Sequence, residues 1–148
     1  MIFIGIDPGA KGAMALLEDN ARLPTIIPFN KEEYIDRLRI IFYEEAPCVC
    51  CIEAVHSIAG QGIASSFRFG ESYGWLLGML DTLCIPYQPI TPQKWKKEFG
   101  LTADKAKSVE VCKQLFPGIK LFRTERSRKE DDGLAEAVLM SLYAKRKF

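Results

Sequence analysis

The sequence has few of the residues that build zinc sites and disulfide frameworks. It contains one histidine, His56, and five cysteines among 148 residues. An odd number of cysteines, three of them within residues 48–51, matches neither the paired ligands of a zinc site nor a complete set of disulfides. We therefore expect reduced thiols that fill apolar positions, with Cys48 and Cys50 on one face of a strand.

Long hydrophobic runs are also missing. Hydrophobic residues make up 48% and charged residues 26% of the chain, which suits the core of a water-soluble domain but leaves no segment able to span a bilayer. The opening MIFIGID has neither a basic region nor a small-residue cleavage site, so we do not expect a signal peptide. We expect a single cytoplasmic domain over residues 1–148.

Basic residues are scarce in the first part of the chain and concentrated in a later one. Residues 1–93 carry 6 Lys and Arg against 11 Asp and Glu, whereas residues 94–129 carry 11 against 4, and the net charge is only +1. A concentrated basic segment in a nearly neutral protein indicates a local anionic partner, although a solvated helix face would give the same pattern.

Apolar periodicity predicts alternating strands and helices. The expected strands are 2–7, 13–19, 25–29, 49–53 and 86–90. The expected helices are 31–45 with Asn30 as N-cap, 65–83, a helix from the cap Thr102 to residue 116, and 131–143. Short links join the first three strands, which predicts an antiparallel meander within a mixed α/β sheet of five strands flanked by helices.

Two further segments have unusual compositions. Gly70, Gly74 and Gly78 are four residues apart and form one stripe on helix 65–83, which predicts close approach of another backbone within the fold or across a dimer. Residues 121–130 contain few apolar and several basic side chains, so we expect a mobile loop that orders on an anionic partner.

Acidic residues end the two clearest apolar strands. Asp7 is followed at once by a Pro-Gly turn, and Glu53 by a loop of small residues. A buried carboxylate is costly unless it is paired or bound to a cation. If the two strands are neighbours, both acids converge on one spot.

The last helix adds further carboxylates. Asp132 and Glu136 are four apart and share a helix face, whereas Asp131 points about 100° away. An acidic first turn also complements the helix dipole, and on its own this helix favours that explanation. Four acids from two strands and a helix would form an oxygen-only site, which suits Mg²⁺ or Mn²⁺ and can hold two ions on the order of 4 Å apart.

These motifs resemble those of the RuvC-type Holliday-junction resolvases, in particular the phage-type branch. The opening IGIDPG, the IEA around Glu53 and the late DGLAEAVLM stand in the family's order, and the resemblance extends over nearly the whole chain. It implies an RNase H-like fold and a homodimer in a bacterial or phage-infected cytosol. The implied activity is that of a metal-dependent endonuclease that resolves four-way DNA junctions by two symmetric nicks, in DNA recombination and repair.

The resemblance also implies roles for individual residues. Asp7 and Glu53 match the first two metal-binding acids, and Glu136 stands in AEA where the family has A-D-A. The family often spaces the helix pair three apart rather than four, so either Asp132 or Asp131 could supply the remaining ligand.

Lysines in the basic segment match two further family positions. Lys107 matches the catalytic lysine, and Lys96, eleven residues earlier, matches a second basic position; Lys97 or Lys105 could substitute for either. A lysine there would stabilise charge on the scissile phosphate or simply position it. The residues expected to contact DNA are Lys94, Lys96, Lys97, Lys105, Lys107, Arg123, Arg126 and Arg128.

One family feature is missing, and other functions compete. The loop after Glu53 lacks the aromatic residue that wedges into the junction, and His56, Ile58 or Phe67 could replace it. A nuclease for flaps, other branched DNA or RNA–DNA hybrids would carry the same acids, and a non-catalytic DNA-binding module could share the fold. A sugar-kinase-type ATPase is disfavoured because 148 residues leave no room for its second domain.

Overall fold

The computed structural model describes residues 1–54, 62–102 and 104–148 and, within these ranges, one mixed sheet of five strands. The strands are β1 (Ile2–Asp7), β2 (Ala13–Glu18), β3 (Thr25–Pro28), β4 (Cys48–Glu53) and β5 (Tyr87–Ile90). Their order is β3-β2-β1-β4-β5; the first three pair antiparallel, and β4 and β5 run parallel to β1. The predicted meander and mixed sheet are confirmed.

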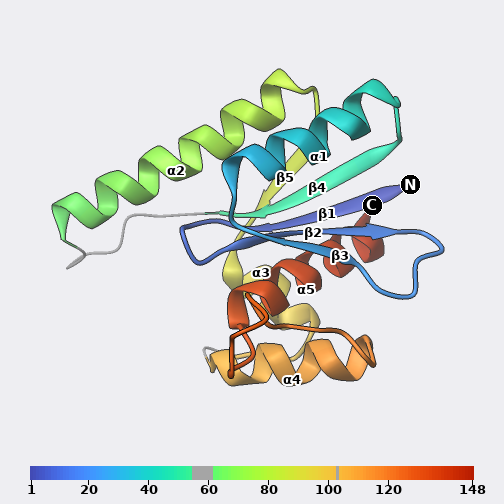
Figure 1. Ribbon diagram of the computed structural model, residues 1–148, viewed down its shortest axis with the longest axis vertical. Coiled ribbons are helices and arrows are strands. Elements are labelled where there is room, and N and C mark those ends of the chain that lie inside the picture. The colour runs from blue at the N-terminus through green and yellow to red at the C-terminus, as the bar shows by residue number, and fades with distance from the viewer. Residues whose placement is uncertain (55–61, 103) are drawn as a thin grey trace.

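Helices cover both faces of this sheet (Figure 1). The helices on one face are α1 (Lys31–Tyr43) and α2 (Ile63–Thr82), and those on the other are α3 (Pro92–Glu98), α4 (Lys105–Leu115) and α5 (Asp132–Lys147). Two hydrophobic clusters fill the layers, because alternate residues of each strand point to opposite faces. Cys50 belongs to the cluster under α1 and α2, and Cys51 to the cluster under α5.

A glycine brings α5 directly onto the central strand. A Cβ atom added to Gly5 would collide with the carbonyl oxygen of Ala137 and the amide of Ser141 and would lie 2.8 Å from the carbonyl carbon of Met140. The helix backbone therefore rests on β1 itself, and this close contact fixes where the first turn of α5 meets the carboxyl end of β1.

The helices differ from the predicted ones at their ends. Asn30 caps α1 as predicted, accepting from the Glu33 amide at 3.1 Å. Asp104, not Thr102, caps α4, because its carboxylate accepts from the Ala106 amide. The short helix α3 was not predicted.

Residues 121–130 form a loop, and the glycine stripe of α2 lies at the surface. The 121–130 segment is irregular as predicted, but Leu121 is fully buried and its carbonyl accepts from the Asp131 amide, so its first residue is anchored in the core. Nothing described lies within 4 Å of a Cβ atom added at any glycine of the Gly70–Gly74–Gly78 stripe. Close approach of another backbone within the described part of the fold is therefore not the reason for the stripe.

The cysteines of β4 fill apolar positions as expected, whereas Cys84 is exposed. All five are free thiols, and Cys50, Cys51 and Cys112 are buried. Burial raises the pKa of Cys51 and of Cys112 to about 12.

None of the helices in the described ranges combines the length and apolarity that crossing a membrane requires.

Candidate active site

Asp7 and Glu53 end two neighbouring strands. The parallel register of β1 and β4 aligns Ile6 with Ile52, so the residues that follow, Asp7 and Glu53, lie side by side at the carboxyl edge of the sheet. Both are partly buried. The expectation that these strands are adjacent is confirmed, and it places two carboxylates together at the edge where a sheet of this kind opens to ligands.

The start of α5 meets Asp7 at Gly133. A Cβ atom added to Gly133 would lie 3.1 Å from Asp7 Oδ2 and 3.2 Å from Asp131 Oδ1, and it would collide with the carbonyl oxygen of Lys11. A residue without a side chain is therefore required for α5 to begin this close to the Asp7 carboxylate. This role of Gly133 was not predicted.

Asp131 caps α5 and pairs with Arg123. Its Oδ1 accepts from the Leu134 amide at 3.1 Å, and Arg123 donates to both carboxylate oxygens, at 2.7 and 2.9 Å. The Arg123 guanidinium holds the pKa of the Asp131 carboxyl below its usual value. Arg123 also donates to the carbonyl oxygens of Lys11 and Gly12, so it joins the segment before α5 to the turn after β1.

Helix α3 holds the Glu53 carboxylate. The indole Nε1 of Trp95 donates to Glu53 Oε2 at 2.8 Å, and the Trp95 side chain is fully buried. A hydrogen bond to an ionised group is stronger than a neutral one and fixes the orientation of Glu53. This contact was not predicted, because no local pattern relates residues 42 positions apart.

Glu136 is buried in α5 between two partners. Lys96 of α3 places its Nζ 3.0 Å from Glu136 Oε1, and the Ser108 hydroxyl of α4 donates to the same oxygen at 3.2 Å. Only 7% of Glu136 is exposed, so this ionic contact offsets a large desolvation cost. Glu136, predicted as a metal ligand, and Lys96, predicted as a DNA contact, therefore neutralise each other's charge.

Tyr34 of α1 brings a hydroxyl near Asp7. This hydroxyl is buried and has no hydrogen-bond partner among the described residues. Burial and, after it, the negative charge of Asp7 raise the pKa of Tyr34, so the phenol stays protonated and can donate. An orphaned donor beside a carboxylate indicates that a polar group, such as a water or a ligand oxygen, belongs between them.

The remaining predicted side chains are exposed, partly buried or outside the residues that the structure describes. Lys94, Lys97 and Lys107 are exposed, and Asp132 is partly buried in the first turn of α5. Arg126 and Arg128 are exposed in the segment before α5. Phe67 is 73% exposed on α2. The other candidates for the junction wedge, His56 and Ile58, lie outside the described residues, as does the side chain of Lys105.

The chemistry of the acids suits a divalent cation, but their described positions do not yet form a complete binding site. Carboxylate oxygens are the ligands that Mg²⁺ and Mn²⁺ prefer, and the orphaned Tyr34 hydroxyl marks an incomplete polar environment beside Asp7. In the described arrangement, however, no three His, Cys, Asp or Glu side chains stand close enough to hold one ion. Glu136 would become available to a cation once Lys96 turned away.

Comparisons with known proteins define the fold. The structure of T. thermophilus RuvC in complex with a Holliday junction substrate matches with a TM-score of 0.65 at 14% identity, covering 99% of this chain and 97% of that one. A second Thermus thermophilus RuvC structure matches with a TM-score of 0.58 at 19% identity, covering 99% and 96%. No protein-family model matches the chain, and no curated protein matches it.

The sheet order and the flanking helices are those of the RNase H-like class. Within that class, the near-complete coverage shows that this chain has the fold of RuvC. At these identities the likeness establishes the architecture but not the activity.

Proposed function

We propose that this chain is a RuvC-like Holliday-junction resolvase of the phage-type branch, a single-domain endonuclease that nicks four-way DNA junctions symmetrically. The observation that carries the proposal is the pair of adjacent strand-end carboxylates, Asp7 and Glu53, beside the acidic first turns of α5. The neighbour bound to a Holliday junction substrate has this fold over nearly its whole length, which supports branched DNA as the partner.

The ligands proposed for two Mg²⁺ or Mn²⁺ ions are Asp7, Glu53, Asp132 and Glu136. When bound, the metal supplies an activated water and charge stabilisation for displacement at phosphorus. Asp131 is disfavoured as a ligand, because both of its oxygens already serve Arg123 and the helix cap. Trp95 holds Glu53 in place, and Tyr34 can donate to a group next to Asp7.

The basic side chains then position the DNA. Lys107 is proposed to stabilise charge on the scissile phosphate, and Lys96 can reach DNA only after leaving Glu136. The proposed backbone contacts are Lys94, Lys96, Lys97, Lys105, Lys107, Arg126 and Arg128. Arg123 is the weakest of the predicted DNA contacts, because its guanidinium is occupied by Asp131 and two carbonyl oxygens.

Two symmetric nicks require two copies of the site, so we propose a homodimer. The exposed face of α2 supports it: the glycine stripe faces open space, and Ile63 and Phe67 are 90% and 73% exposed. Exposed large apolar side chains beside small residues are typical of a surface that another chain covers.

Cleavage of labelled DNA tests the activity. A four-way junction, a linear duplex, a flap and an RNA–DNA hybrid of one sequence are incubated with protein and Mg²⁺ or Mn²⁺. Asp7→Asn removes a proposed ligand charge, and Asp36→Asn, at an exposed position of α1, is the matched control. Paired nicks in the junction alone, lost in Asp7→Asn and kept in Asp36→Asn, are expected.

Other outcomes favour the competing functions. Equal or faster cutting of flaps or hybrids would identify a different branched-substrate nuclease with the same acids. Junction binding without cutting in either metal would leave a DNA-binding module and exclude the resolvase.

Metal binding can be measured without activity. The chain has two tryptophans, so Trp75→Phe leaves Trp95, which contacts Glu53, as the sole indole. Titration of Ca²⁺ or Mg²⁺ should change Trp95 fluorescence with saturation, and Asp7→Asn should abolish the change. An indole signal indifferent to both ions would contradict metal binding at Glu53.

A further inference from the structure

A second concave site lies on the other side of α3 from the acids. It has a volume of about 720 Å³ and is formed by β5, α3 and the last turns of α5. This is within the roughly 300–1,000 Å³ of ordinary ligand pockets. Its main polar side chains are Lys94, Lys97 and Glu98 of α3, Gln88 of β5, and Tyr143 and Lys147 of α5. We call it the Lys94 pocket.

Cationic groups outnumber anionic ones in the Lys94 pocket. Glu98 is engaged by Lys147, 2.7 Å between Nζ and Oε2, and by Arg146 at 3.5 Å. Lys94 and Lys97, in contrast, form no ion pair within the described part of the chain, and both are exposed. Lys94 and Lys97 therefore remain as two ammonium groups that no carboxylate side chain of the pocket neutralises.

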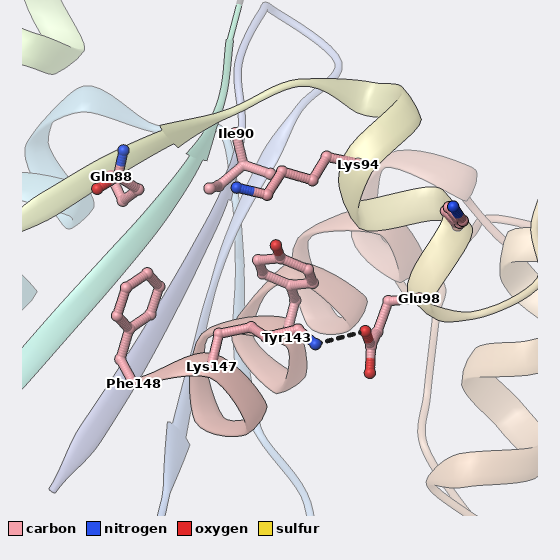
Figure 2. Close-up of a pocket in the computed structure, with 8 residues that line it drawn as sticks. Gln88, Ile90, Lys94, Glu98, Tyr143, Lys147 and Phe148 are labelled. Carbon is pink, nitrogen blue, oxygen red and sulfur yellow. Dashed lines mark ion pairs between the residues drawn. The ribbon is translucent and has the colours of Figure 1, made fainter.

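The hydroxyl of Tyr143 is a further donor in this pocket. The Tyr143 side chain is 3% exposed, and its ring lies under Lys147 Nζ at 5.8 Å. Figure 2 shows the hydroxyl pointing away from the Glu98–Lys147 pair and toward the Lys94 side chain, which extends across Ile90. Within residues 1–54, 62–102 and 104–148, this hydroxyl makes no hydrogen bond. Burial raises the pKa of Tyr143, so the group remains a donor.

We propose that the Lys94 pocket binds a phosphate group, with Lys94, Lys97 and the Tyr143 hydroxyl as donors. Phosphate oxygens accept several charge-assisted hydrogen bonds at once, which matches two ammonium groups and a phenol around one concavity. The apolar floor formed by Ile90 can bear the sugar or base attached to that phosphate.

The arrangement of α3 relates this pocket to the acids. Lys94 and Lys97 are three residues apart and share one side of the helix, whereas Trp95 and Lys96 reach Glu53 and Glu136. If the proposed junction cleavage holds, on which this extension rests, the pocket takes a backbone phosphate of a DNA arm away from the cut. A free nucleotide offers the same chemistry.

The test uses two variants of the pocket and one matched control. Tyr143→Phe removes only the hydroxyl and keeps the buried ring. Lys94→Gln with Lys97→Gln removes the two unpaired charges. Lys31→Gln with Lys120→Gln removes two exposed charges that do not line the pocket. Thermal melting confirms that each variant is folded.

Binding is measured for a labelled four-way junction in EDTA and, separately, for AMP and inorganic phosphate by titration calorimetry. We expect Tyr143→Phe to weaken binding about tenfold, as for loss of a hydrogen bond to a charged group. We expect the pocket lysine pair to lower the salt dependence of junction binding by about one phosphate contact, while the control pair leaves it unchanged.

The outcomes separate the pocket from the activity. Loss of both junction and AMP binding supports a backbone phosphate, and loss of AMP binding alone supports a nucleotide. If the wild type binds no DNA but binds AMP through Tyr143, the proposed function fails and the pocket stands. If both pocket variants equal the control pair in every titration, the Lys94 pocket does not bind phosphate.

Discussion

The two longest helices, α2 and α5, lie on opposite faces of the sheet and are buried to very different extents. In α5, 11 of 16 residues are buried, against three of 20 in α2. Glycines are found on both faces, but Gly5 of β1 and Gly133 of α5 allow α5 to approach the sheet and Asp7, whereas the glycine stripe of α2 faces open space. The same residue type thus builds a closed layer around the acids on one face and an uncovered layer on the other.

The difference in burial between α2 and α5 separates two functions within one fold. The closed face positions carboxylates through backbone contact and buried partners, which limits how far they can move. The open face leaves large apolar groups to be covered by another chain, as proposed for the homodimer. Matched substitutions on the two faces should therefore have opposite effects on the stability of the monomer.

The largest effect is expected at Gly5. Gly5→Ala places a methyl group against the backbone of α5, which cannot give way as a flexible side chain would. We expect a loss of about 3 kcal/mol in the free energy of unfolding, or failure to fold. Urea denaturation followed by circular dichroism measures it.

Gly74→Ala is the matched change on the open face. The monomer should gain roughly 0.5–1 kcal/mol, because alanine favours a helix and meets no neighbour. If the stripe is the dimer interface, sedimentation should show weaker self-association. A large loss of monomer stability in Gly74→Ala, or none in Gly5→Ala, would contradict the comparison.

Lys96→Met should leave Glu136 as a buried charge without its cation. We expect a loss of about 3 kcal/mol in metal-free buffer, measured by urea denaturation. Adding Glu136→Gln to this variant should recover most of the loss, because both charges are then gone. If Glu136 binds metal, Mg²⁺ should stabilise Lys96→Met more than it stabilises the wild type.

Arg123→Met tests whether Arg123 is structural or a DNA contact. It removes the Asp131 pair and two bonds to carbonyl oxygens, and we expect a cost of about 1 kcal/mol after allowing for partial exposure. Arg126→Met, at an exposed position, should change stability by less than about 0.5 kcal/mol. Unchanged stability with weaker DNA binding in Arg123→Met would reverse this assignment.

Thiol labelling compares the faces without changing stability. At pH 8 a thiol whose pKa has been raised to about 12 stays protonated and unreactive, which applies to Cys51 and Cys112. Burial raises the pKa of Cys50 as well, and Cys84 is exposed. Mass spectrometry should find Cys84 alkylated first, and the buried thiols modified only after unfolding.

The sequence predicted the features that depend on local patterns. Short continuous apolar runs located β1 and β4, and the acids at their ends fell side by side because parallel neighbouring strands end at the same edge. Asn30 was found because a cap acts within three residues.

Contacts between distant segments were not predictable in the same way. Helix α3 is too short for a periodic pattern, although Thr91 before Pro92 is a typical helix start. The partners that α3 gives to Glu53 and Glu136 depend on packing, as does the choice of Asp131 for Arg123. Packing, which the sequence pattern does not show, therefore distinguishes the helix cap Asp131 from the candidate ligand Asp132 one position later.

The order of strands also bears on whether copies of the protein can pair through the edges of their sheets. The outermost strands, β3 and β5, have four residues each, and each contains a proline, Pro28 or Pro89. Proline has no N–H to offer, and short edge strands give an incoming chain little to pair with. Ribbon-like aggregation through the sheet edges is therefore disfavoured at both ends, even when many copies crowd together during synthesis.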